Sequence, residues 1–237
     1  MTMFERGIFK PLSWLIGEQA VGIGAGLYIN KWALEGDAVI AETANSSAGR
    51  GRNPSHLLYF KAAFLDGDFR NIQQWAFGSF KKFTPDEYSL GYLLLSGMRF
   101  RSGNSYLMGD VMTTLVDQFY NPSGTSLAYK RASGYTVEEN LRITAQSMTK
   151  LWREEDSLRA PFTSFKYLTP ETEDYVSYTS SMITPDGISY AVKTDLDEAP
   201  RLVNVFQDGG EETLLFLGRV NGEPVLKNNR LYWSESS

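Results

Sequence analysis

The segment INKWALEGDAVIAETANSSAGRGR, residues Ile29–Arg52, raises the first question about this chain. It reads as an alanine-rich helix followed by a glycine-arginine loop, yet it holds two carboxylates, Glu35 and Glu42. At helical pitch these two residues return to one face, two turns apart. A carboxylate in an apolar helix is costly unless it is paired or binds a metal. The segment therefore predicts either ion pairs, with Arg50 or Arg52 as the nearest bases, or a functional site.

The next strong helix signal lies further along the chain. Thr84-Pro85-Asp86-Glu87 reads as a capping box with proline at the first helical position. It opens the run from Tyr88 to Met98, which is apolar nearly all round and is therefore expected to be buried. Arg99, Arg101 and Gly103 suit the end of this helix, because bases and a glycine favour a helix C-terminus.

Two more helices are predicted on either side of this run. Asn53-Pro54 begins one, and Asp66-Gly67 ends it. Thr136-Val137-Glu138-Glu139 is a second capping box, and it opens a helix whose apolar residues recur at helical spacing. Those residues are Leu141, Ala145, Met148 and Trp152.

The charge balance and the hydrophobic pattern of the chain both change near residue 168. Residues 1–167 hold 18 Lys+Arg and 16 Asp+Glu, whereas residues 168–237 hold 5 and 12. The acidic tail shows short alternating runs separated by turn residues, which is typical of antiparallel strands. The expected strands are Tyr175–Thr179, Ile188–Val192, Arg201–Phe206, Thr213–Leu217 and Leu231–Trp233. The sequence thus predicts an α+β chain, with a helical subdomain at 1–167 and a β-strand-rich segment at 168–237.

Composition excludes several kinds of function. A net charge of −5 does not favour nucleic acid as a partner. There is no cysteine, so thiolate metal sites and cysteine nucleophiles are ruled out. The single histidine, His56, rules out a two-histidine metal site within this sequence, and a structural role is expected for it. No apolar run is long enough to span a membrane, and Met1–Lys10 does not read as a signal peptide.

Trp32-Ala33-Leu34-Glu35-Gly36-Asp37-Ala38 resembles the W-x-x-E-G-x-A segment of gluzincin-type zinc metallopeptidases. Glu42-Thr43, Gly49-Arg50-Gly51-Arg52, Gly78-Ser79-Phe80-Lys81 and Pro85–Tyr92 continue a likeness to large exported Bacteroidetes proteins. In those proteins a peptidase-like domain is fused to a TolB-type β-propeller. The resemblance covers roughly residues 8 to 110 well, and the strand-rich tail is similar to the start of the propeller more loosely.

The resemblance implies roles for two residues. Glu35 corresponds to the family's zinc-ligating glutamate, and Tyr88 resembles the tyrosine that hydrogen-bonds the oxyanion of the tetrahedral intermediate. Zinc in such sites polarises the carbonyl and activates water, and a phenol stabilises the developing charge. The family's His-Glu-x-x-His helix is not in this sequence. We therefore interpret the chain as a fragment that is inactive alone and binds no zinc alone, while the full-length parent would bind zinc and cleave peptides or proteins.

A second hypothesis is a non-catalytic binding or scaffold protein with a degenerate peptidase core. It predicts that Glu35 is salt-bridged, for example to an arginine, and that Tyr175, Tyr178 or Trp233 cluster on a surface of the tail. The family resemblance also implies a periplasmic or outer-membrane location. If the chain is a fragment, an apolar surface left exposed by truncation could support a homodimer.

Overall fold

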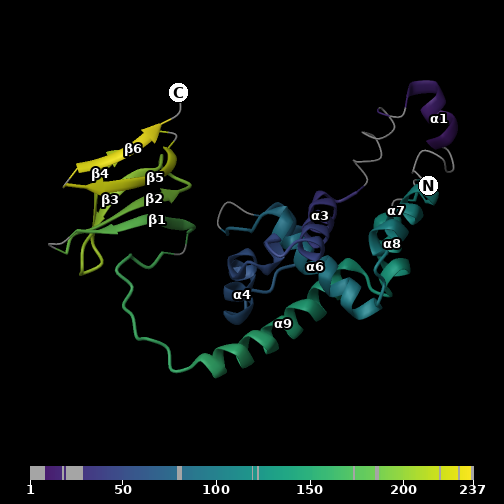
Figure 1. Ribbon diagram of the computed structural model, residues 1–237, viewed down its shortest axis with the longest axis horizontal. Helices are drawn as coiled ribbons and strands as arrows, with labels where there is room; N and C mark the ends of the chain where they lie inside the picture. Colours follow the sequence, from purple (N-terminus) through teal and green to yellow (C-terminus); the bar gives the residue numbers. More distant parts are fainter. Residues whose placement is uncertain are drawn as a thin grey trace. The chain divides into compact units, whose positions relative to one another are not determined.

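The computed structural model forms two compact units, Met1–Gly78 with Thr84–Ala160, and Ser79–Phe83 with Pro161–Ser237. The first unit is helical and the second is antiparallel sheet, which confirms the predicted α+β class (Figure 1). The residues that the structure describes are 9–17, 19, 29–78, 82–118, 120–121, 123–172, 174–184, 187–218, 220–228 and 230–235.

The helical unit contains both long α-helices and short 3₁₀ turns. The α-helices are α1 (Phe9–Ile16), α3 (Lys31–Asn45), α4 (Leu58–Leu65), α5 (Ile72–Phe77), α6 (Glu87–Ser102), α7 (Leu107–Asp117), α8 (Gly124–Ser133) and α9 (Val137–Arg159). The 3₁₀ turns are η2 (Arg50–Arg52) and η3 (Pro54–Leu57). The helix predicted from Asn53-Pro54 thus begins as a 3₁₀ turn and continues as α4, with Asp66 at its C-cap.

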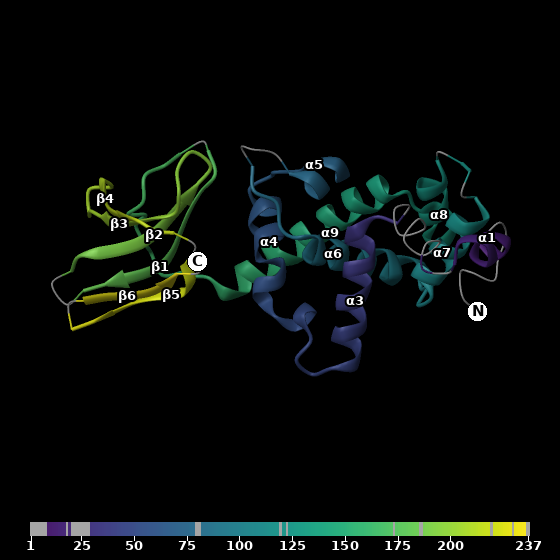
Figure 2. The same ribbon diagram turned by 90° about the horizontal axis from the view of Figure 1, so that it is seen from above.

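Helix α6 is the centre of the helical unit, and it contacts α3, α5, α8 and α9. The prediction that this run is buried is confirmed, since residues on several sides of the helix are inaccessible. The predicted C-terminus is confirmed as well, with Gly103 in the left-handed conformation at φ 66°. Figure 2 shows α3, α6 and α9 crossing within this unit.

The predicted start of α6 is wrong by two residues. The cap is Asp86, whose carboxylate accepts the Ser89 N–H at 2.9 Å, and Thr84 and Pro85 precede the helix. Aspartate and threonine both cap helices well, and the ionised carboxylate also interacts favourably with the positive end of the helix. The second predicted capping box is confirmed, because Thr136 and Glu139 satisfy each other's backbone N–H groups at the start of α9.

Aromatic rings fill the space between α4, α5 and α9. The Trp75 side chain is 1% exposed and lies 4.9 Å from the Phe60 ring and 6.0 Å from the Phe64 ring, centroid to centroid. The Arg70 guanidinium covers the Trp75 ring at 4.4 Å. These contacts hold the short helix α5 against the longer helices, which explains how a six-residue helix keeps a fixed place.

The second unit contains a four-stranded antiparallel sheet with the strands in chain order, and a separate two-stranded hairpin (Figure 1). The strands are β1 (Val176–Ile183), β2 (Ser189–Asp195), β3 (Arg201–Val205), β4 (Glu211–Phe216), β5 (Val220–Lys227) and β6 (Arg230–Glu235). The five predicted strands are confirmed. Strand β5 was not predicted, because glycine and proline interrupt its alternation.

The second unit also takes in residues from the region between α5 and α6. The Phe83 ring stacks on the Tyr175 ring, with centroids 5.1 Å apart and planes 14° from parallel. No pattern in the sequence predicted this pairing, since the two residues lie far apart along the chain. Among the described residues, no helix is both long and apolar enough to cross a membrane.

The sheet is predicted to lose stability in acid. The Arg201 guanidinium donates to the Asp195 carboxylate at 2.5 Å and lowers the pKa of that carboxyl from 3.8 to about 2. A lowered pKa in the folded state contributes stability above the unfolded value, which is lost as the pH falls through the folded value. We expect the urea midpoint, followed by the Val203 and Val205 methyl NMR signals, to fall between pH 4 and pH 2.

The Asp195→Asn variant is the control for this expectation. It should be less stable than the unaltered chain at pH 5, because Arg201 loses the closer of its charged partners and keeps only Glu198 at 3.2 Å, and nearly equal to it at pH 2. Equal stability of the two proteins at pH 5 would show that the ion pair does not stabilise the sheet.

Candidate functional site

Helices α3 and α6 touch backbone to backbone. A Cβ on Gly91 would lie 1.7 Å from the Trp32 carbonyl oxygen, and a Cβ on Gly36 would lie 2.2 Å from the Gly91 carbonyl carbon. Only glycine fits at this crossing, because any side-chain carbon would overlap the other helix. The close approach brings the residues of α3 and the first turns of α6 within reach of each other.

Glu35 on α3 and Tyr88 on α6, the two residues that the resemblance singled out, are brought near each other by this crossing. The Glu35 carboxylate raises the pKa of Tyr88, first as the acceptor of a hydrogen bond from the phenol and second through its negative charge. Both side chains are half-buried. The structure thus brings together two predicted site residues that lie far apart in sequence.

Arg50 joins this pair from the loop that follows α3. Its guanidinium carbon lies 4.7 Å from the centroid of the Tyr88 ring, a cation–π distance. Its Nε donates to Glu42 Oε2 at 2.9 Å, and its backbone N–H donates to Glu42 Oε1 at 3.0 Å. The prediction that Glu42 pairs with Arg50 or Arg52 is confirmed. These hydrogen bonds lower the pKa of Glu42.

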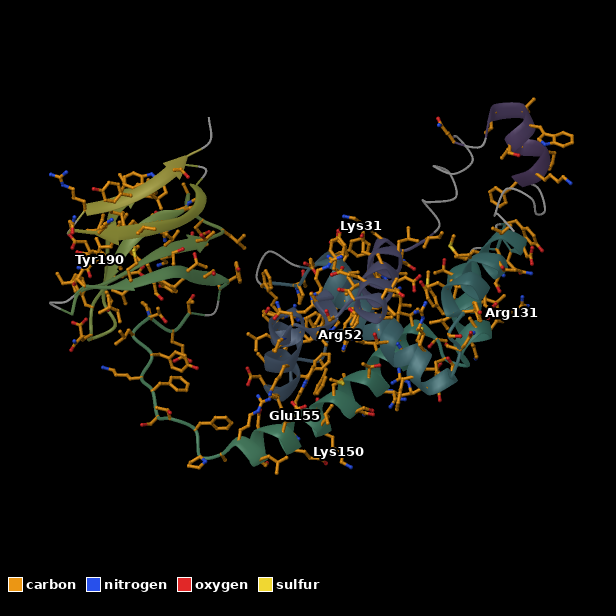
Figure 3. All side chains as sticks on the ribbon, in the orientation of Figure 1. Lys31, Arg52, Arg131, Lys150, Glu155 and Tyr190 are labelled. Carbon is orange, nitrogen blue, oxygen red and sulfur yellow. The ribbon has the colours of Figure 1, made fainter. Side chains whose placement is uncertain are left out.

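The glycine-arginine loop is anchored to the end of α3. The Gly51 N–H donates to Thr43 Oγ1 at 3.0 Å, and Arg52 Nη2 donates to the Thr43 carbonyl at 3.0 Å. A Cβ on Gly49 would lie 2.4 Å from the Thr43 Cα. The loop is therefore a tightly packed, ion-paired turn, and it fixes Arg50 over Tyr88. Arg52 is labelled in Figure 3.

A second bridge crosses the two helices one turn earlier on α3. Lys31, labelled in Figure 3, forms an ion pair with Glu87, the first residue of α6. The hydrogen bond to Glu87 raises the pKa of Lys31 and lowers that of Glu87. No pattern in the sequence had predicted this pair. The sequence positions could have indicated it: Lys31 lies one helical turn before Glu35, and Glu87 directly precedes Tyr88.

His56 belongs to a different cluster of side chains, with Ser89 and Tyr92. Its Nδ1 is 3.4 Å from the Ser89 hydroxyl, and its ring meets the Tyr92 ring edge-on at 5.6 Å. Burial lowers the pKa of His56, so the neutral imidazole is favoured. The contacts are those of a packed structural histidine, in line with the role expected from the sequence.

The described residues do not form a zinc site by themselves. Catalytic zinc needs three protein ligands. In the part of the chain that the structure describes, no three histidine, aspartate or glutamate side chains are grouped closely enough to hold a metal ion. Glu35 is a single carboxylate whose neighbour is a phenol. A catalytic zinc here would need two further ligands from outside the described residues.

No protein-family model, no curated protein and no solved structure matches this chain.

Proposed function

We propose that this chain carries part of the active site of a gluzincin-type zinc metallopeptidase, with Glu35 as one metal ligand and Tyr88 as a hydrogen-bond donor to the substrate. The observation that supports this proposal is the close α3–α6 crossing, which brings Glu35 near Tyr88 so that the carboxylate raises the pKa of the phenol. The family resemblance selects these residues from two motifs that lie far apart in the sequence. Their meeting across the α3–α6 crossing is what a shared site requires.

Tyr88 has the properties that its proposed role needs. The phenol is protonated at neutral pH, and its raised pKa favours that form further. Its one O–H, which the Glu35 carboxylate accepts in this chain, would turn to the substrate oxygen that gains negative charge once Glu35 ligates zinc. Arg50 holds one face of the ring and is itself held by Glu42. The ring is therefore held in place before substrate binds, which limits the reorganisation that the hydroxyl needs in order to donate in the transition state.

The parent protein is proposed to act on peptides or proteins, with a TolB-type propeller beside the peptidase part and an exported location. The propeller is supported by the sheet of β1 to β4, an antiparallel meander in chain order such as a propeller blade contains. We also retain the prediction that this chain forms a homodimer through an exposed apolar surface.

The non-catalytic scaffold is the alternative. One observation favours it, because the ion pair between Glu42 and Arg50 beside Tyr88 gives both charged residues a structural partner. The scaffold hypothesis also predicted a salt bridge at Glu35 and clustered aromatic residues on the surface of the tail, and the contacts of these residues are different. The partner of Glu35 is a tyrosine, Tyr175 stacks on Phe83, and the Tyr178 hydroxyl donates to Glu211 at 2.8 Å.

The proposal is tested on an extended chain, defined as this sequence joined to the segment encoded directly upstream of Met1. We expect that segment to contain an in-frame His-Glu-x-x-His motif, and the extended chain to hydrolyse peptides in a zinc-dependent reaction. The chain of 237 residues alone should show no hydrolysis above background. A stop codon directly upstream, or peptide hydrolysis by the 237-residue chain at the same rate, would contradict the proposal.

A further inference from the structure

A large cavity opens in the helical unit next to the Lys31–Glu87 bridge. Its volume is about 1100 Å³, above the roughly 300–1,000 Å³ of typical small-molecule sites. It lies among the N-terminal ends of several helices and the short helix α5, and its lining includes both bridge residues. On α3 the bridge is one turn from Glu35, and on α6 it directly precedes Tyr88. The cavity therefore begins beside the proposed site.

The walls of the cavity combine apolar surface with an excess of negative charge. Trp32, Trp75 and Leu90 are almost fully buried and form part of the apolar lining, while Phe77 in the same lining is 83% exposed. The charged lining residues are Lys31 against Asp86, Glu87 and Glu138. Such a surface complements a ligand that has apolar side chains and a positive charge.

The existing hydrogen bonds and ion pairs of these acids show which of them can still bind a ligand. Asp86 caps α6 through the Ser89 N–H, and Glu87 is paired with Lys31. Glu138 accepts one hydrogen bond, from the Ile72 N–H at 3.1 Å, through a single carboxylate oxygen. A carboxylate has several acceptor positions, so Glu138 keeps capacity for a cationic group.

We propose that this cavity binds an extended segment of polypeptide in which an apolar side chain is followed by lysine or arginine. This inference rests on the proposed peptidase function, because it names the substrate class of that site. The apolar floor receives the apolar side chain, and Glu138 faces the positive charge.

The test is a fluorescence-polarisation titration of the 237-residue chain, without added metal, using two fluorescein-labelled hexapeptides. One is Ala-Leu-Lys-Leu-Lys-Ala and the other Ala-Leu-Glu-Leu-Glu-Ala. We expect saturable binding of the basic peptide only, weakening as NaCl rises from 50 to 500 mM because salt screens exposed charges. Binding of both peptides with equal affinity, or of neither at millimolar protein, would overturn the proposal.

Two charge-removing variants of α9 locate the site. Glu138→Gln keeps an acceptor for the Ile72 N–H and should weaken the basic peptide by about two- to fivefold, the range of an exposed ion pair. Glu154→Gln is the matched control, since its side chain is 61% exposed and it does not line the cavity. Equal effects of the two variants would place the peptide elsewhere.

Failure here and failure of the proposed function are distinguishable. Binding is measured without zinc or catalysis, so an absent peptide site leaves the Glu35–Tyr88 proposal in place. Conversely, a chain that binds the basic peptide but forms no zinc-dependent peptidase when extended contradicts the proposed function alone.

Discussion

Replacing Gly91 by alanine is expected to unfold much of the helical unit. The new Cβ would lie 1.7 Å from the Trp32 carbonyl oxygen, and backbone on both sides cannot move away by changing a rotamer. Overpacking a core costs typically 1–3 kcal/mol, and this clash lies at or above the upper end of that range. Urea unfolding followed by tryptophan fluorescence should show a loss of about 3–5 kcal/mol, a large share of a domain's stability.

The matched control is Gly109→Ala in α7. Gly109 is also helical, but a Cβ there meets no atom within 4 Å. Alanine loses less conformational entropy than glycine on folding, so this variant should be more stable by about 0.5–1 kcal/mol. If both variants changed stability alike, the α3–α6 contact would not be as close as described.

The second large effect is expected from Tyr88→Phe in the extended chain. Phenylalanine keeps the ring under Arg50 and removes only the hydroxyl. The loss of one preorganised donor to a developing oxyanion lowers kcat by about 10²–10³ in comparable enzymes. We expect a fall of this size in kcat for peptide hydrolysis, with unfolding temperature and zinc content unchanged.

Tyr92→Phe is the control for the tyrosine experiment, because Tyr92 lies one turn further on the same helix. Its hydroxyl makes one long hydrogen bond, 3.4 Å to the Gly51 carbonyl. We expect kcat to change less than about twofold, since a bond this long contributes little. A similar fall in kcat for both variants would mean that Tyr88 acts through the packing of the helix rather than through its hydroxyl.

The sequence predicted those parts of the fold that depend on local signals. The Thr136–Glu139 box, the Gly103 terminus and the strands of the tail each follow from a few neighbouring residues. The start of α6 was misplaced because Thr84 and Asp86 are both good caps and only the folded backbone chooses between them. Strand β5 was missed because the hairpin with β6, rather than its own alternation, holds it.

The candidate site was predictable only in part, for a related reason. The Glu42–Arg50 pair could be predicted because the two residues are close in sequence. The contact between Glu35 and Tyr88 depends on Gly36 and Gly91, and no local pattern reveals that two distant glycines will face each other. The resemblance selected both residues. The cavity beside them could not be predicted, because it depends on how the ends of several helices are arranged in space.

Zinc content tests the central claim most directly, because it asks whether Glu35 is a metal ligand. The extended chain and its Glu35→Gln variant would be purified identically and the zinc per polypeptide measured by mass spectrometry. We predict one zinc per extended chain and a loss of most of it in the variant, while Glu42→Gln, one helical repeat away, retains the metal. Equal zinc in the extended chain and in Glu35→Gln, or no zinc in either, would contradict the account.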